Sequence, residues 1–344
     1  MLRLALASLL ASAALATVTP TAQAYPDPIL TTDRTGDPAV VETSNGRVMV
    51  ATGPLLRRAR WDPGEGWRWI KPALARLPRW AIDDGDVWAA DLAQIDGRWV
   101  LYYAVRVAGL GKGGRCIGMA TARTAYDRFR PVDARPLVCY PRARTPRAYD
   151  TVPNTPDLPG LPHRGVIDPS FFLDDDGTPY LLYKTDRLPS SIRLLPLGPR
   201  GLAPVAGATS SELVRASWVM ENPVVLRRGD FYHLFTSEDI WSKCSYRTVW
   251  RRSTDLATWP VRPRRVLLNR TTTDGLCGPG GADLLMVDDQ PLLYFHGWLR
   301  IDNDRPPDPP FVEGGRGPDA RRVLYGARLR FTNDAPIVAR YLTH

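Results

Sequence analysis

The chain has 344 residues, of which 44% are hydrophobic, and it carries a formal net charge of +9. That charge comes almost entirely from arginine, since only four of the 45 basic residues are lysines. A basic surface attracts nucleic acids and other anionic polymers. The arginines are scattered, however, and no run of them resembles a nucleic-acid-binding motif. We therefore expect no nucleic-acid partner.

Residues 1–24 have the pattern of a secretory signal peptide. Arg3 supplies the positive charge, residues 4–16 form a short apolar run, and Ala22-Gln23-Ala24 fits the small-residue cleavage rule. The apolar run is too short to span a bilayer, and no later run is long and apolar enough. We expect a secreted, monomeric protein that is free of the membrane after cleavage, with residues 25–344 forming one domain.

Within the mature chain one pattern recurs five times: an acidic residue, a short apolar strand, a turn and a second strand. In chain order the copies occupy residues 37–50, 91–102, 168–184, 221–235 and 283–295. The residues that begin them are Asp37, Asp91, Asp168, Glu221 and Asp283. The recurrence predicts one structural unit that is repeated around the fold.

The turns inside the copies favour tight hairpins, because four of them contain a glycine that accepts a positive φ. These turns are Asn45-Gly46, Asp96-Gly97, Asp176-Gly177 and Arg228-Gly229, and the fifth copy uses Asp288-Asp289-Gln290. The acids are 54, 77, 53 and 62 residues apart, which suits a four-stranded sheet with its loops. We predict an all-β fold, a five-bladed β-propeller. A β-sandwich or a β-helix is the alternative, but a sandwich needs no regular repeat.

In a propeller, the first strand of each blade lines the central channel, and a residue at its start lies at one mouth. The five acids are therefore expected around one axis in a shared, wet pocket. Like charges placed so close together raise one another's pKa values. Because such a cluster costs stability, it suggests a functional site.

Carboxyl groups with separated pKa values are the groups that hydrolyse glycosidic bonds. A protonated acid donates to the leaving oxygen, and an ionised partner activates water or attacks carbon. A separation of about 6.5–9.5 Å fits inversion of configuration, and about 5 Å fits retention. A channel mouth can provide either distance, so both mechanisms remain open at this point.

Five motifs in register make the chain resemble glycoside hydrolase family 43. Three of them are acidic: Asp37-Pro38, Ile167-Asp168-Pro-Ser-Phe-Phe and Met220-Glu221-Asn-Pro. The others are Val87-Trp88-Ala-Ala-Asp91 and, in the fifth copy, Cys277-Gly-Pro-Gly-Gly281 together with Tyr294-Phe-His-Gly-Trp298. The resemblance covers nearly the whole mature chain. It implies a secreted, inverting five-bladed propeller that acts on α-L-arabinofuranosides or β-D-xylosides of oligo- or polysaccharides.

The resemblance also implies roles for the three acids. Asp37 matches the general base, Glu221 the general acid, and Asp168 the acid that tunes and orients Glu221. Like-charge repulsion from Asp168 would hold Glu221 protonated at neutral pH. A simple structural role at the start of a strand, such as an Asp-Pro pair can have, is the alternative for each acid.

Aromatic and polar residues near the predicted channel mouth are candidates for substrate binding, because indoles stack on sugar rings. These candidates are Trp88, Asp91, Trp241, His296 and Trp298. Loop packing is the competing role for the tryptophans, and a purely structural role is the competing one for Asp91 and His296.

The chain departs from the family at Gly281, where many members have a histidine near a central cation. We therefore expect no metal and no cofactor, although a structural calcium in the channel is the alternative.

Four cysteines remain after the signal peptide: Cys116, Cys139, Cys244 and Cys277. An even number in an exported chain favours two disulfides. Three pairings exist, and we predict the local one, Cys116–Cys139 with Cys244–Cys277. Their spacings match no zinc motif.

Two other functions remain open. One is a sugar-binding propeller that has lost its chemistry, and the other is a retaining furanosidase of a related propeller family. The sequence does not distinguish exo from endo cleavage and does not name the glycone.

Overall fold

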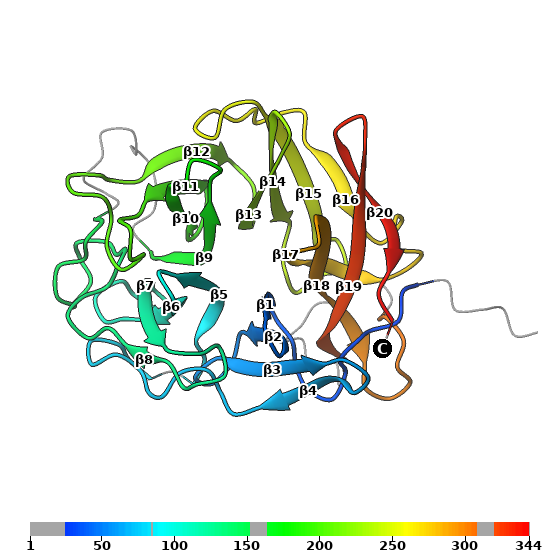
Figure 1. The fold of residues 1–344 in the computed structure, drawn as a ribbon, viewed down its shortest axis with the longest axis horizontal. Helices are drawn as coiled ribbons and strands as arrows, with labels where there is room; N and C mark the ends of the chain where they lie inside the picture. The colour runs from blue at the N-terminus through cyan, green and yellow to red at the C-terminus, as the bar shows by residue number, and fades with distance from the viewer. Residues whose placement is uncertain (1–24, 84, 152–163, 308–319, 344) are drawn as a thin grey trace, which may run out of the picture.

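The computed structural model describes residues 25–83, 85–151, 164–307 and 320–343, so the predicted signal peptide lies outside the described part. This part contains 20 β-strands, arranged as five four-stranded antiparallel sheets. Among the described residues there is no helix long and apolar enough to cross a membrane. The sheets are arranged around a common axis, with β1, β5, β9, β13 and β17 innermost (Figure 1). The predicted five-bladed β-propeller is confirmed.

The blades are numbered in chain order. Each is built from four consecutive strands, of which the first is nearest the axis and the fourth is at the rim. Blade 1 contains β1 (Ala39–Thr43), β2 (Gly46–Ala51), β3 (Arg57–Asp62) and β4 (Gly66–Ile70). Blade 2 contains β5 (Trp88–Ile95), β6 (Arg98–Arg106), β7 (Arg115–Ala122) and β8 (Arg130–Pro131). Blade 3 contains β9 (Val166–Leu173), β10 (Pro179–Thr185), β11 (Ser190–Pro196) and β12 (Ser211–Ala216).

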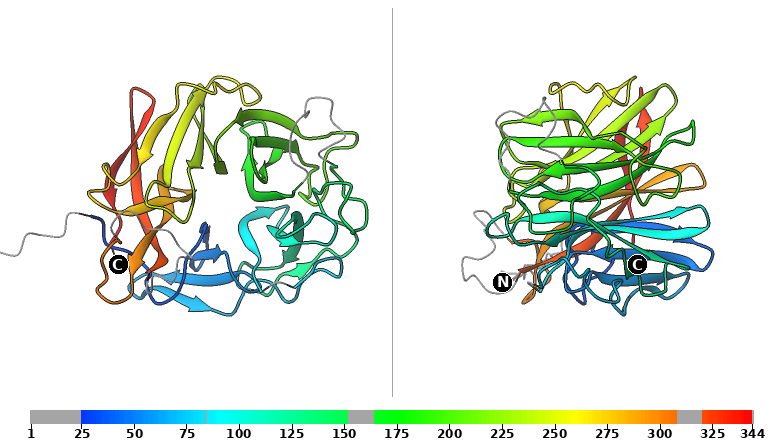
Figure 2. Two further views of the ribbon diagram at one scale, coloured as in Figure 1. Left: turned by 180° about the vertical axis from the view of Figure 1, so that it is seen from behind. Right: turned by 90° about the vertical axis from the view of Figure 1, so that its left-hand side faces the viewer.

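Blade 4 contains β13 (Met220–Arg228), β14 (Phe231–Glu238), β15 (Arg247–Ser253) and β16 (Arg265–Leu268). Blade 5 contains β17 (Cys277–Val287), β18 (Gln290–Arg300), β19 (Ala320–Thr332) and β20 (Ala335–Tyr341). The ring closes where blade 5 meets blade 1, as the left-hand view in Figure 2 also shows. There the Ile29 amide donates to the Leu324 carbonyl at 2.8 Å, and Leu324 donates to Leu30 at 3.2 Å.

The repeated unit is defined by one left-handed residue at the channel end of each inner strand. Its φ lies between 27° and 58° in all five blades, and the residues are Asp37, Ala89, Asp168, Asn222 and Gly281. In blades 2 to 5 the pairing register of the inner strand shifts at this point, as a β-bulge requires. Positive φ favours glycine, asparagine and aspartate. This preference accounts for Asp37 and Asp168, the two acids that occupy the left-handed position.

This register corrects the predicted alignment of the acids. Only Asp37 and Asp168 occupy the left-handed position, and Glu221 stands one residue before it. Asp91 and Asp283 stand two residues after it, because Ala89 and Gly281 take the left-handed position in their blades. The five carboxyl groups therefore do not form a single ring.

Side chains near the axis bind neighbouring blades together. Carboxylates of three blades accept backbone amides of the next inner strand: Asp91 from Phe171 at 2.6 Å, Asp168 from Asn222 at 3.0 Å, and Asp283 from Val40 at 2.7 Å. Hydroxyls serve the other two junctions: Thr52 accepts from Ala89 at 3.0 Å, and Ser237 accepts from Gly281 at 2.8 Å. Every junction thus has a specific hydrogen bond next to the channel.

Two disulfides pair the four cysteines as predicted. Cys116, on β7, is bonded to Cys139, and Cys244 is bonded to Cys277, the first residue of β17. The first bond lies in the core of blade 2 among buried apolar residues. The second packs against the buried Trp298. It therefore ties the β14–β15 loop to blade 5.

The hydrogen bond that closes the ring can be tested by two substitutions of Asp283. Asparagine keeps an oxygen for the Val40 amide, whereas leucine does not, and both remove the charge. We expect Asp283→Leu to unfold more easily than Asp283→Asn by about 1–3 kcal/mol, because the buried amide loses its partner. Urea denaturation measures the difference, and equal stabilities of the two variants would contradict this role.

Candidate active site

A cavity of about 720 Å³ lies over one mouth of the channel. Residues of all five blades line it, among them Asp37, Trp88, Asp168, Glu221 and Arg322. A much narrower space of about 30 Å³ continues along the axis below it. The three predicted catalytic acids therefore share one pocket, although they come from blades 1, 3 and 4.

Asp37 is surrounded by groups that orient its carboxylate. Thr52 Oγ1 donates to Asp37 Oδ2 at 2.8 Å, and Arg322 Nη1 lies 3.3 Å from Oδ1. Because Thr52 Oγ1 already accepts the Ala89 amide, its own hydrogen is free to point at Asp37. The backbone amide of Asp37 donates to His296 Nδ1 at 3.2 Å. The carboxylate is thus held by a hydroxyl and a cation.

His296 supports Asp37 from behind and is fully buried. Burial, and then the charge of Arg322, lower the pKa of His296 well below its usual value, so the ring is neutral. The ring stacks on Tyr246 with centroids 5.7 Å apart. Of the two roles considered for His296, this burial favours the structural one.

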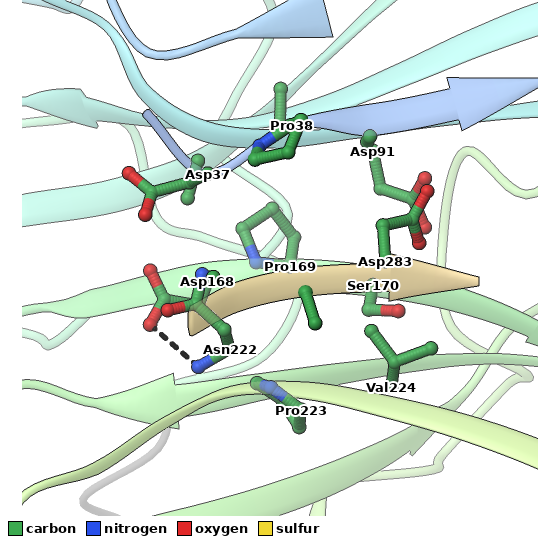
Figure 3. A pocket seen from close by; sticks show the side chains of 15 residues that line it. Asp37, Pro38, Asp91, Asp168, Pro169, Ser170, Asn222, Pro223, Val224 and Asp283 are labelled. Atoms are coloured by element: carbon green, nitrogen blue, oxygen red, sulfur yellow. Dashed lines mark hydrogen bonds between the residues drawn. The ribbon is translucent and has the colours of Figure 1, made fainter. Parts of the chain in front are cut away.

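Asp168 is the buried acid of the pocket. Burial, and then the charge of Glu221, raise the pKa of Asp168 well above its usual value, while Lys184 acts in the opposite direction. Asp168 Oδ2 accepts the Asn222 amide at 3.0 Å (Figure 3). Asp168 can therefore hold a proton at neutral pH while its other oxygen remains anchored.

Glu221 has two partners that sequence reasoning missed. Lys184 Nζ lies 2.9 Å from Glu221 Oε2, and the Tyr246 hydroxyl lies 2.9 Å from Oε1. Burial raises the pKa of Tyr246 well above its usual value, so its hydroxyl remains a donor. The signal for Lys184 was a lone lysine, one of four in the chain, at the end of an apolar strand. Tyr246 gave no signal, since its position depends on the β14–β15 loop.

Two tryptophans form walls of the pocket. Trp88 has one face covered by the Arg115 guanidinium, 3.6 Å from the ring centroid. Trp241 is 40% exposed and stacks on Trp298 at 6.2 Å. Trp298 is itself buried and donates to the Trp241 carbonyl at 3.1 Å, so it supports the wall rather than forming it. Of the two roles considered for Trp298, this burial favours packing.

Asp91 and Asp283 lie deeper along the axis, where their carboxyl groups face each other away from Asp37 and Asp168 (Figure 3). Burial raises the pKa of Asp91 to about 6. Burial, and then the charge of Asp91, raise the pKa of Asp283 well above its usual value. Both line only the narrow space, and each accepts an amide of a neighbouring blade. Of the two roles considered for Asp91, this position favours the structural one.

The donor set does not fit a central metal ion. In the described ranges no three His, Cys, Asp or Glu side chains gather as ligands. His296 Nδ1 accepts the Asp37 amide, which leaves the proton of the neutral ring on Nε2. A side chain at Gly281 would also strike this ring, since a Cβ there would lie 2.5 Å from Nδ1.

Comparisons with known proteins agree with this arrangement. Residues 151–316 match the model of glycosyl hydrolases family 43. The resemblance to glycoside hydrolase family 43 is confirmed. A curated relative, the extracellular exo-α-(1→5)-L-arabinofuranosidase ArbA of Cellvibrio japonicus (strain Ueda107), is 26% identical over 227 residues. That match covers 60% of this chain and spans 59% of the relative's length.

Solved structures share the family 43 fold. An α-L-arabinanase of Cellvibrio cellulosa, solved with arabinohexaose, superposes with a TM-score of 0.67 at 19% identity, over 91% of this chain and 99% of its own. An endo-1,4-β-xylanase of Bacteroides thetaiotaomicron VPI-5482 gives 0.63 at 17% identity, over 89% and 94%. At these identities the likeness establishes the fold alone.

The raised pKa of Asp168 predicts a pH-dependent gain in stability for Asp168→Asn. The folded-state pKa lies above the unfolded one, so the contribution of Asp168 to stability is lost as pH rises through the folded value. The variant removes that loss and keeps an oxygen for the Asn222 amide. We expect it to melt at a higher temperature than the native chain at pH 8, with a gain that fades toward pH 4.

Thermal melting of both proteins across this range measures the gain, with the exposed Asp230→Asn as the control. A difference in melting temperature that stays constant with pH would show that the charge of Asp168 is not its cause.

Proposed function

We propose that the protein is an exported, inverting glycoside hydrolase that cleaves α-L-arabinofuranosides or β-D-xylosides of oligo- or polysaccharides. The observation that carries the proposal is the meeting of Asp37, Asp168 and Glu221 in one pocket walled by tryptophans. The arabinofuranosidase, arabinanase and xylanase relatives support this substrate class. The extracellular curated relative supports export.

In the proposed reaction, Asp37 takes a proton from a water molecule that attacks the anomeric carbon. Glu221 gives its proton to the glycosidic oxygen as the bond between that oxygen and the anomeric carbon breaks. Each turnover leaves Asp37 protonated and Glu221 ionised, and exchange with solvent restores both. Thr52 and Arg322 hold the base in place, and Asp168 tunes the acid.

Inversion needs room for water between base and sugar, a carboxyl separation of about 6.5–9.5 Å. Asp37 belongs to blade 1 and Glu221 to blade 4, and these blades are not neighbours in the ring. Asp168, on blade 3, is next to Glu221 instead, which suits a tuning acid. This distribution favours Asp37 as the base on the far side of the sugar.

The proposal predicts distinct defects for the two reacting acids. We expect Asp37→Asn and Glu221→Gln each to lower kcat by about 10²–10⁴-fold, the usual contribution of general acid–base catalysis. Glu221→Gln should be least impaired on aryl glycosides whose leaving group needs no proton. Hydrolysis of arabino- and xylo-oligosaccharides measures both losses of kcat. Hydrolysis of 4-nitrophenyl α-L-arabinofuranoside and β-D-xyloside tests the dependence on the leaving group, and Asp230→Asn is the control.

Proton NMR of the first product formed decides the stereochemistry. We expect the anomer opposite to that of the substrate. A first product of unchanged configuration would identify a retaining enzyme, and hydrolysis that Glu221→Gln leaves unaffected would remove this residue from the mechanism. Sugar binding without any hydrolysis would indicate a binding protein.

A further prediction concerns the Trp241 wall, which the Cys244–Cys277 disulfide and Trp298 hold in place. Replacing both cysteines with serine should raise KM about 2–10-fold, because ordering a side chain on binding costs about 0.5–1.5 kcal/mol. The matched control is the serine double variant of Cys116 and Cys139, which lies in blade 2. Steady-state kinetics on arabino-oligosaccharides measures the change, and an equal effect of both double variants would point to general loosening.

A further inference from the structure

Lys184 is the one lysine of the described residues that is buried in the pocket. It lies on β10, is 3% exposed, and its Nζ is 2.9 Å from Glu221 Oε2. Although burial acts to lower it, the charges of Glu221 and Asp168 raise the pKa of Lys184 above its usual value. The ammonium is therefore charged at neutral pH.

The charges around Lys184 do not balance. Two carboxyl groups, Asp168 and Glu221, share this single ammonium. The other charged groups near them are already paired, since Arg322 lies beside Asp37 and Arg187 lies 3.6 Å from Asp186. The Tyr246 hydroxyl faces Glu221 as a neutral donor. One cation can compensate one carboxylate, which leaves the second carboxyl group to carry a proton.

We propose that Lys184 is a positioning residue that keeps the Asp168–Glu221 pair at one proton and holds the Glu221 carboxylate once that proton has been given to the leaving oxygen. The inference rests on the proposed glycosidase activity. Asp168 alone does not suffice for this role. Repulsion between the two carboxyl groups disfavours ionisation of both, but only a cation such as Lys184 stabilises the Glu221 carboxylate that forms after proton transfer.

This role has a consequence for the pH profile. Without the ammonium, two carboxyl groups would face each other uncompensated, and the pair would hold its proton to a higher pH. The alkaline limb of the kcat/KM profile reports loss of that proton. Removing the positive charge should therefore move the alkaline limb upward by about one to three pH units, the usual effect of a close opposite charge. The acidic limb should stay in place.

Two variants separate charge from hydrogen bonding. Lys184→Gln keeps a donor for Glu221 without the charge, and Lys184→Arg keeps the charge. We expect the glutamine variant to shift the alkaline limb upward and to lower kcat about 10-fold or more on glycosides with poor leaving groups, which need the proton most. The arginine variant should keep the native limb. Lys71→Met, an exposed lysine on blade 1, is the control.

Outcomes distinguish this inference from the proposed function. A native protein that hydrolyses no aryl glycoside would defeat the glycosidase proposal itself. Native activity that depends on Glu221, combined with an unmoved alkaline limb in Lys184→Gln, would overturn only the role of Lys184. A uniform loss of rate at every pH in both Lys184 variants would also overturn it, since that pattern indicates a structural part.

Stability supplies a second readout if the glutamine variant folds poorly. Adding Asp168→Asn removes one negative charge together with the positive one. Charge compensation predicts that the double variant melts at a higher temperature than Lys184→Gln alone, and no recovery would contradict it.

Discussion

The propeller depends on a backbone constraint that recurs at the channel end of every inner strand, where one residue is left-handed. A side chain of the preceding blade accepts the amide of that left-handed residue at four of the five junctions near the axis. In blade 3 the left-handed residue is Asp168, whose side chain also accepts the Asn222 amide. The same geometry that joins the blades thus exposes acids to the pocket.

The pocket concentrates charge and compensates it unevenly. Asp37 has Arg322 and Thr52, whereas Glu221 and Asp168 share the single ammonium of Lys184. The base that must stay ionised is therefore next to a cation of its own, and the Asp168–Glu221 pair is left to hold one proton. Blades 1, 3, 4 and 5 all contribute residues to this arrangement, which no single sheet could assemble.

The sequence was sufficient to predict the fold and the meeting of three acids, because the hairpin pattern repeats at a regular spacing along the chain. The disulfides could be predicted from the even number of cysteines and their nearness in sequence. The sequence alignment misplaced Asp91 and Asp283, since the feature that repeats in every blade is a positive φ at one position and not an acidic residue. Ala89 and Gly281 occupy that position without an acid. Arg322 and Tyr246 reach the pocket from a third strand and a loop, so only the three-dimensional arrangement reveals them.

Blade 5 is built entirely from the chain's last strands, so no strand crosses the seam between the first and last blades. Noncovalent bonds alone hold that seam: the Ile29 and Leu324 amides, Asp283 with Val40, and His296 and Arg322 with Asp37. Asp37, the proposed general base, thus lies at this seam and depends on residues of both blades, and the ring can open there without breaking a blade. Parting of this seam would separate Asp37 from His296 and Arg322 while the four-stranded sheet of every blade remained intact.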